Sequence, residues 1–229
     1  MTLIVGIICR DAIVLAADSQ TTKGIAKIPG TTKIRVIDFV NGKALVAESG
    51  SASLSNSAIE AFQRLAKVVK IEDEFTISKS AEAAVREIRN QITSLHPTNN
   101  SPQEWQDYFF RDENYFELMV AYYHGGNPHL YKLNPVWCIP VPATFYFLTS
   151  GIAADLANYI LKEHTEPMMD SEFASVIAIK VVEDAIEYVE GCGSPTRVAC
   201  RRMNRMNPHG KAVKMNQVRQ VYYSPKKGI

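Results

Sequence analysis

The chain has 229 residues, of which 46% are apolar and 21% are charged, as is typical of a soluble globular protein. Its apolar runs are too short to span a membrane, and it does not open with the basic segment and apolar run of a signal peptide. We therefore expect a cytoplasmic protein without a membrane partner, built as one domain over residues 1–229.

The net charge of +1 hides an uneven distribution. No acidic residue follows Glu190, whereas nine lysines and arginines lie between Arg197 and the end of the chain. A basic segment on an acidic body binds nucleic acid in some proteins and docks on a neighbouring copy in others. Because no groove motif with interleaved aromatic residues accompanies the charge, we favour assembly of identical copies, with a basic C-terminal extension from about residue 197.

Short β-branched runs and segments of helical period follow one another along the chain. Asn41-Gly42 is the strongest short-range hairpin signal, and from Gly50 the apolar residues recur at three- and four-residue steps, as in an amphipathic helix. Residues 19–32 and 96–114 are polar and predict loops, with ragged edge strands in the first and a short extra helix in the second as alternatives. The predicted elements are strands 3–9, 12–17, 33–38 and 43–49, helices 51–70 and 77–95, strands 116–123, 129–133 and 143–148, helices 152–163 and 171–189, and strands 197–203 and 213–222.

This order of elements favours an α+β fold. Strands, two helices, strands, two helices and strands would bury every apolar face if two antiparallel sheets stacked on each other and helices covered both outer sides. Ser51 and Ser78 are plausible N-caps of the first two helices. The two strands at 3–9 and 12–17 are apolar almost throughout, which suggests burial on both faces.

Motifs for metals, cofactors and serine nucleophiles are missing from the sequence. The four cysteines are scattered without a CxxC pair, which favours free, mostly buried thiols over a disulfide or metal framework. The five histidines show no ligand spacing. There is no GxSxG, HExxH or Walker loop. We therefore expect no metal and no cofactor.

Thr2 directly follows the start methionine. Removal of Met1 would leave Thr2 with a free α-amine beside its own hydroxyl. A hydroxyl is a poor nucleophile until a base takes its proton, and an N-terminal amine, whose pKa is about 7.7–8, can be that base. We therefore interpret the chain as an N-terminal-nucleophile hydrolase, with an ordinary threonine at the start of a strand as the alternative.

Several short sequence motifs follow one another along the chain. They are TLIVGI at 2–7, RD at 10–11, VLAADS at 14–19, KI at 33–34, LYKLNP at 130–135 and TSG at 149–151. Together they resemble the proteasome β-subunit superfamily, over residues 2 to about 189. The opening string is specific, and the later ones are weak alone but correctly ordered. The family's Asp-x-x-Ser-Gly-Gly is represented only by Glu190–Ser194, whose register stays open.

The resemblance implies a four-layer αββα sandwich and a threonine-type peptidase. Such an enzyme works in a self-compartmentalising ring or helical homo-oligomer and cleaves unfolded proteins or peptides through an acyl-enzyme; whether an ATPase feeds it is left open. With only Met1 before Thr2, the chain resembles the simpler bacterial relatives without a propeptide. The alternatives are a non-catalytic ring subunit of the same fold and a small-amide hydrolase with the same nucleophile.

The resemblance also implies the catalytic residues. Lys33 would sit beside the Thr2 hydroxyl, where its charge favours the ionised oxygen and lowers the pKa of the amine. Asp18 would pair with Lys33, since a buried charge needs a partner. The alternatives are a solvated strand lysine and a turn or cap aspartate. Ser150 would lie near the amine, although it could equally cap the helix that follows it.

The remaining site residues rest on the resemblance alone. Ala47 stands where the family usually has its oxyanion-hole glycine, and its backbone N–H is the candidate oxyanion donor. Thr22 would lie near the substrate strand. Leu45 and Ser49 would line the specificity pocket.

Overall fold

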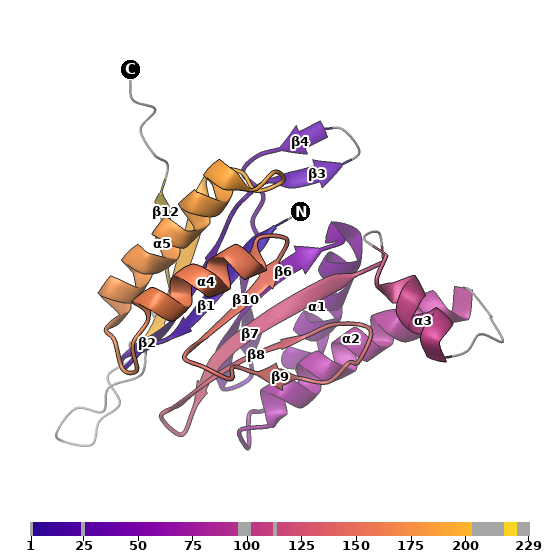
Figure 1. The fold of residues 1–229 in the computed structure, drawn as a ribbon. Coiled ribbons are helices and arrows are strands. Elements are labelled where there is room, and N and C mark those ends of the chain that lie inside the picture. Colours follow the sequence, from indigo (N-terminus) through magenta and orange to yellow (C-terminus); the bar gives the residue numbers. More distant parts are fainter. Residues whose placement is uncertain (1, 24–25, 96–101, 112–113, 203–217, 224–229) are drawn as a thin grey trace.

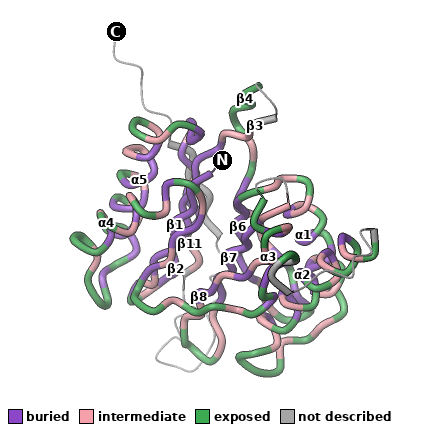
Figure 2. Tube along the Cα trace, turned by 45° about the vertical axis from the view of Figure 1, so that its right-hand side comes forward, coloured by how far each residue is buried: buried purple, intermediate pink, exposed green. Residues whose placement is uncertain are grey.

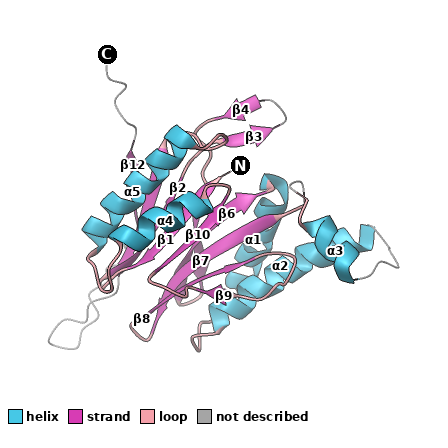
Figure 3. Ribbon diagram, viewed as in Figure 1, coloured by secondary structure: helices cyan, strands magenta, loops and turns pink. Residues whose placement is uncertain are grey.

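The computed structural model describes residues 2–23, 26–95, 102–111, 114–202 and 218–223. Two antiparallel five-stranded sheets lie against each other, and helices cover the outer face of each (Figure 1). The prediction of an α+β, four-layer αββα sandwich is confirmed. Figure 3 shows the strands together in the middle, α1 and α2 on one side and α4 and α5 on the other.

The first sheet has the order β10-β1-β2-β11-β12 and the second the order β5-β6-β7-β8-β9. The strands of the first are β1 (Leu3–Ile8), β2 (Ala12–Ala17), β10 (Phe147–Gly151), β11 (Thr196–Arg202) and β12 (Val218–Tyr223). Those of the second are β5 (Ile34–Phe39), β6 (Gly42–Gly50), β7 (Phe116–His124), β8 (Asn127–Leu133) and β9 (Val141–Pro142). The ribbon β3 (Thr21–Lys23) and β4 (Ala26–Ile28) stands apart, and the helices are α1 (Ala52–Ala66), α2 (Thr76–Leu95), α3 (Pro102–Phe109), α4 (Ala154–His164) and α5 (Ser171–Tyr188).

Apolar side chains fill each interface between layers. Phe62 and Val85 belong to the cluster beneath α1 and α2, and Leu3 and Val181 to the cluster beneath α4 and α5. Ile4 belongs to the cluster between the two sheets. Because neighbouring residues of β1 point to opposite faces, the strand is buried on both sides, which explains its unbroken apolar run. Figure 2 shows this buried trace through β1, β2, β6 and β7.

The pleat of β6 decides which of its side chains can face the first sheet. Leu45 and Ala47 lie in the cluster between the sheets, whereas Ala44 and Val46 lie in the cluster beneath α1 and α2. Alternation along the strand puts Ser49 on the inner face with Leu45 and Ala47.

The helix starts differ from the prediction in their contacts. Ser51 occupies the N-cap position of α1 but makes no capping hydrogen bond through its side chain. Ser78 lies inside α2, which begins at Thr76, so its assignment as a cap was wrong. Asp73 Oδ1 instead accepts from Phe75 N at 3.0 Å and from Thr76 Oγ1 at 2.7 Å.

The bounds of two elements differ from the predicted ones because tertiary contacts outweigh local periodicity. The first helix ends at Ala66, not at 70, and Val69 O then accepts a backbone hydrogen bond from Val40 N at 3.3 Å. The strand predicted at 143–148 is β10, at Phe147–Gly151, because its register is set by pairing with β1. The preceding Phe145 is apolar but 61% exposed.

The two polar segments predicted as loops contain the strands and the short helix that were given as alternatives to a loop. The loop at 19–32 contains β3 and β4, and the segment at 96–114 contains α3. Of the segment from 197, the part up to Arg202 belongs to β11, which pairs with β2 and β12 inside the first sheet, in agreement with the strand predicted at 197–203. Arg197 donates to Gly30 O at 2.5 Å, and Arg201 donates to Lys43 O. Residues 203–217 and 224–229, which carry five of the nine basic residues that follow Glu190, lie outside the described residues.

None of the described cysteines forms a disulfide with another described residue, and Cys9, Cys138 and Cys192 are buried, as the sequence predicted. None of the helices in the described part of the chain has both the length and the apolar character needed to cross a membrane.

Gly151 offers a test of the contact between β1 and β10. It has φ +103°, and a Cβ built on it would lie 1.9 Å from Thr2 O. Gly126 also has a positive φ, +85°, but its Cβ would meet nothing within 4 Å. We expect Gly151→Ala to lower the free energy of unfolding by about 3 kcal/mol and Gly126→Ala by about 1 kcal/mol, measured by denaturant unfolding. Equal losses would contradict the close approach.

Candidate active site

Thr2 lies at the entrance to β1 and is only 5% exposed. Its carbonyl oxygen accepts a hydrogen bond from Ile152 N at 2.9 Å, just after the end of β10. The close approach of Gly151 to the same carbonyl leaves room for no side chain there. The backbone of Thr2 is therefore held against β10, and its side chain points into the space between the sheets, like that of Ile4.

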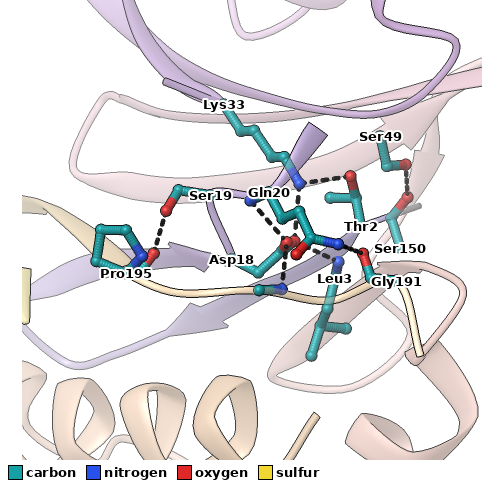
Figure 4. Close-up of polar contacts among 11 residues, drawn as sticks. Thr2, Leu3, Asp18, Ser19, Gln20, Lys33, Ser49, Ser150, Gly191 and Pro195 are labelled. Atoms are coloured by element: carbon teal, nitrogen blue, oxygen red, sulfur yellow. Dashed lines mark hydrogen bonds and ion pairs between the residues drawn. The ribbon is translucent and has the colours of Figure 1, made fainter. Parts of the chain in front are cut away.

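Lys33 reaches Thr2 from the other sheet. It precedes β5 and is 4% exposed. Its Nζ donates to Thr2 Oγ1 at 2.7 Å and to Asp18 Oδ1 at 2.9 Å (Figure 4). The structure thus brings Thr2, Lys33 and Asp18 together from three different strand ends, in the contacts that the resemblance implies.

Asp18 follows β2 directly and is fully buried. Besides Lys33, its carboxylate accepts from the backbone N–H groups of Leu3 at 2.9 Å, Gln20 at 3.1 Å and Gly193 at 3.2 Å. Buried carboxylates are tolerated when donors surround them in this way. The carboxylate therefore fixes three chain segments and the ammonium at one point.

Burial lowers the pKa of Lys33 from its ordinary value of 10.5, and the charge of Asp18 works in the opposite direction. A buried cation 2.7 Å from the Thr2 oxygen favours the ionised form of that oxygen. The arrangement can therefore stabilise an alkoxide or a hydroxyl that is losing its proton.

Ser150 is not a helix cap. The N-cap position of α4 is Ala153, and the Ser150 hydroxyl donates to Glu117 Oε2 at 2.5 Å. Its oxygen also lies 2.6 Å from Ser49 Oγ. Ser49 is 4% exposed and faces Ser150, so this contact replaces its predicted place in a specificity pocket. Glu117 had no signal in the sequence, since it is one acidic residue in an apolar strand.

The assignments of Ala47 and Leu45 were wrong. Leu45 is fully buried in the cluster between the sheets and cannot line a substrate pocket. Glu48 N donates to Lys33 O, and Ser51 N donates to Tyr115 O. Since successive N–H groups along a strand point to opposite sides, the N–H of Ala47 faces β7, where Ala47 pairs with Met119, and is committed to the ladder.

The alternating direction of the N–H groups along β6 also identifies Gly50 as a candidate donor. In the sequence this glycine marks only the start of a helix. Its N–H points away from β7, on the edge from which Lys33 comes, and lies beyond the first residue of β5. Gly50 has φ +89°, and a Cβ would lie 2.4 Å from Tyr115 O, so only glycine fits. The available signal was a glycine at the junction of a strand and a helix.

The segment Glu190–Ser194 lies against the corner formed by residues 18–20, and its register against the family motif stays open. Gly193 N bonds Asp18, and Gly193 O accepts from Ser19 N at 3.0 Å. Gln20 Nε2 donates to Gly191 O at 3.3 Å (Figure 4). Cys192, between the two glycines, is buried, and burial raises the pKa of its thiol to about 11. Through the hydrogen bond from Gly193 N, this segment helps to hold the Asp18 carboxylate in place.

Thr22 belongs to β3, but its side chain lies outside the described residues, so its place near the substrate strand stays a prediction. No group of three or more histidine, cysteine, aspartate or glutamate side chains suited to a metal ion occurs among the residues that the structure describes.

Comparisons with known proteins agree on the family and the fold. The family model "Proteasome subunit" matches residues 2–200. A mutant of Anbu from Hyphomicrobium sp. strain MC1 has a TM-score of 0.74 at 15% identity, over 99% of this chain and 88% of that chain. Anbu (ancestral beta-subunit) from Yersinia bercovieri has a TM-score of 0.74 at 13% identity, over 98% and 88%.

A third solved structure, the helical assembly of the Anbu complex from Pseudomonas aeruginosa, has a TM-score of 0.70 at 19% identity, over 94% of this chain and 88% of that chain. At these identities the solved structures show the shared fold. A comparison with curated protein sequences found no match.

The pair of Lys33 and Asp18 is open to a stability test. Asp18→Asn removes the charge that faces a buried ammonium, and we expect the free energy of unfolding to fall by about 3–5 kcal/mol. Asp18→Asn combined with Lys33→Met removes both charges and should recover most of that loss, measured by urea unfolding. A single variant within about 1 kcal/mol of the wild type would contradict the pairing.

Proposed function

Because the chain belongs to the proteasome family, we propose that it is a threonine-type peptidase with Thr2 as its nucleophile. It cleaves peptide bonds of unfolded proteins or peptides through an acyl-enzyme. The observation that carries the proposal is the single ammonium of Lys33, which contacts Thr2 Oγ1 at 2.7 Å and Asp18 Oδ1 at 2.9 Å. A surface lysine or a structural strand-start threonine has no need of this arrangement.

The reaction begins once Met1 is removed. The α-amine of Thr2 takes the proton of its own hydroxyl, and Oγ attacks the carbonyl carbon of the peptide bond. The α-ammonium of Thr2 formed in this way then gives its proton to the leaving nitrogen as the carbon–nitrogen bond breaks, and an ester on Thr2 remains. Water, activated by the same amine, hydrolyses the ester and restores the hydroxyl. The Lys33 cation stabilises the oxygen at each stage where it carries negative charge.

We assign the oxyanion donor to the backbone N–H of Gly50 in place of Ala47. Its N–H points to the edge of β6 that Lys33 also occupies, and β5 has not begun opposite it. A backbone donor at the developing oxyanion is typically worth about 3–4 kcal/mol of transition-state stabilisation. The missing side chain lets the substrate backbone approach.

We further propose that copies of the chain assemble with one another. The fold is shared with Anbu proteins, one of which forms a helical assembly in Pseudomonas aeruginosa. A ring or helix of this kind confines the site and admits only unfolded chains or peptides. The cytoplasm is the proposed compartment, since buried free thiols such as Cys9 and Cys138 are typical of reducing conditions.

The nucleophile is tested by paired substitutions at Thr2. We expect Thr2→Ala to abolish hydrolysis of fluorogenic peptides and Thr2→Ser to retain it at a rate lowered by about tenfold to a hundredfold, because serine keeps the hydroxyl and the amine. Intact mass first verifies that Met1 is absent from every variant. Hydrolysis by Thr2→Ala at the wild-type rate would reject the proposal, and hydrolysis of simple amides but not peptides would favour a small-amide hydrolase.

The lowered pKa of Lys33 predicts an alkaline limit to activity. As pH rises through that pKa, below 10.5, the ammonium loses its proton and the Thr2 oxygen loses its cation, so kcat/KM should fall. Stability should behave oppositely, because between the folded and unfolded pKa of Lys33 the unfolded chain binds more protons and this group's contribution rises with pH. Parallel measurements of kcat/KM and Tm check both signs. Unchanged kcat/KM up to 10.5 would contradict the role of the cation.

A further inference from the structure

A second buried polar cluster lies beside Thr2, and the mechanism above does not use it. Its centre is Glu117 of β7, which is 6% exposed. Glu117 Oε2 accepts from Ser150 Oγ at 2.5 Å, and Oε1 accepts from Tyr115 OH at 2.8 Å. Lys132 Nζ lies 3.5 Å from Oε1. These partners come from β8, from β10 in the opposite sheet and from the residue before β7.

The direction of each hydrogen bond in this cluster follows from the carboxylate. An ionised carboxylate only accepts, so Ser150 must donate its single proton to Glu117. Burial and the charge of Glu117 raise the pKa of Tyr115, which therefore keeps its proton and donates as well. Ser49 then has to donate to Ser150, because Ser150 has no proton left for their 2.6 Å contact. Ser150 faces the rest of the site as an acceptor.

Ser150 and Thr2 present their side chains to the same space. In the pairing of β1 with β10, Ile4 lies opposite Ser150. Thr2 is two residues before Ile4 on the same face, which makes Thr2 and Ser150 diagonal neighbours. Figure 4 shows both side chains together between Lys33 and Ser49. An α-amine on Thr2 has N–H groups that need acceptors, and Ser150 offers one.

We propose that Glu117 is a positioning residue that makes Ser150 a hydrogen-bond acceptor for the α-amine of Thr2. The inference rests on the proposed nucleophile, Thr2, and adds Glu117 to the residues that position its α-amine. With one N–H held by Ser150, the amine can turn its lone pair toward the Thr2 hydroxyl. The negative charge of Glu117, which Lys132 at 3.5 Å partly offsets, also favours the ammonium formed during attack.

The substitution Glu117→Gln reverses this polarity with almost no change of shape. Tyr115 and Lys132 both face the Oε1 position, so the glutamine oxygen is expected there. The amide NH2 then occupies the Oε2 position and donates to Ser150. Ser150 has to turn its proton away from residue 117, toward Ser49 or the amine, and stops being a free acceptor.

The test measures the pKa of the Thr2 α-amine directly, by competitive acetylation with acetic anhydride across pH and mass analysis of the N-terminal peptide. We expect Glu117→Gln to lower that pKa by about one unit. Ser150→Ala should lower it similarly, and Glu117→Gln should add less than half of its own shift in the Ser150→Ala background. Peptide kcat/KM at pH 7 is expected to fall about tenfold in Glu117→Gln.

Glu48→Gln is the matched control, because Glu48 is a glutamate of β6 that is equally buried, at 5% exposed, and pairs with Arg35. Its side chain lies on the opposite face from Ser49, so it should shift the amine pKa by less than a third as much. The other charged groups near Thr2 are Lys33, which precedes β5, and Asp18, which follows β2; the Cys192 thiol, whose raised pKa keeps it uncharged near neutral pH, lies close to both, and all variants keep these residues.

The inference is overturned if Glu117→Gln leaves the amine pKa unchanged while near-UV circular dichroism shows a native fold. It is also overturned if the shift is the same with and without Ser150, since Glu117 would then act by charge alone. Because acetylation reports the amine whether or not peptides are cleaved, a failure of peptidase activity leaves this result readable. If Glu117→Gln does not fold, Ser150→Ala must still lower the pKa and Ser150→Thr must not.

Discussion

One buried ammonium joins the two sheets at the site. Lys33 comes from the second sheet, while Thr2 and Asp18 belong to the first, and Nζ bonds both at 2.7 and 2.9 Å. Burying such a charge is costly unless partners surround it, so the contact exists only when the sandwich is closed and Asp18 is in place. The backbone donors from Leu3, Gln20 and Gly193 hold the carboxylate there. Fold and chemistry therefore depend on the same few bonds.

Two buried groups of opposite charge lie near Thr2. Lys33 presents a cation to the hydroxyl, and its burial lowers its own pKa. The second buried cluster near Thr2 is centred on the carboxylate of Glu117, which accepts from Ser150 at 2.5 Å. A residue that is nucleophile and base at once needs its oxygen made more acidic and its nitrogen kept basic. In the proposed mechanism, the Lys33 cation at the oxygen and the Ser150 acceptor at the nitrogen would supply both.

The sequence predicted the layers because their signals are local. The apolar runs around Arg10-Asp11, the Asn41-Gly42 turn and the change of period at Gly50 each depend on neighbours in the chain. Thr2, Asp18 and Lys33 came from the resemblance together with the chemistry of an N-terminal threonine. The failures at Leu45 and Ala47 have one cause: the strand was right, but which face and which edge each residue uses is set by pairing with β5 and β7.

Other features could not be predicted because they exist only in three dimensions. A serine before a helix looks like a cap, and only the packing of β10 on β7 sends Ser150 to Glu117. Gly193 meets Asp18 across 175 residues of chain. The helical period of the first helix continues to Val69, yet the backbone contact with Val40 ends the helix earlier. Periodicity reports a preference, and tertiary contacts decide the boundaries.

The most direct test of the central claim is the mass of the Met1-free chain after incubation with a peptide electrophile that reacts with both the amine and the hydroxyl of one residue. We expect one adduct per chain, mapped to the peptide that begins at Thr2 and absent when Lys33 is replaced by methionine. A chain that stays unmodified, or that carries its adduct at Cys192 or another side chain, would contradict it.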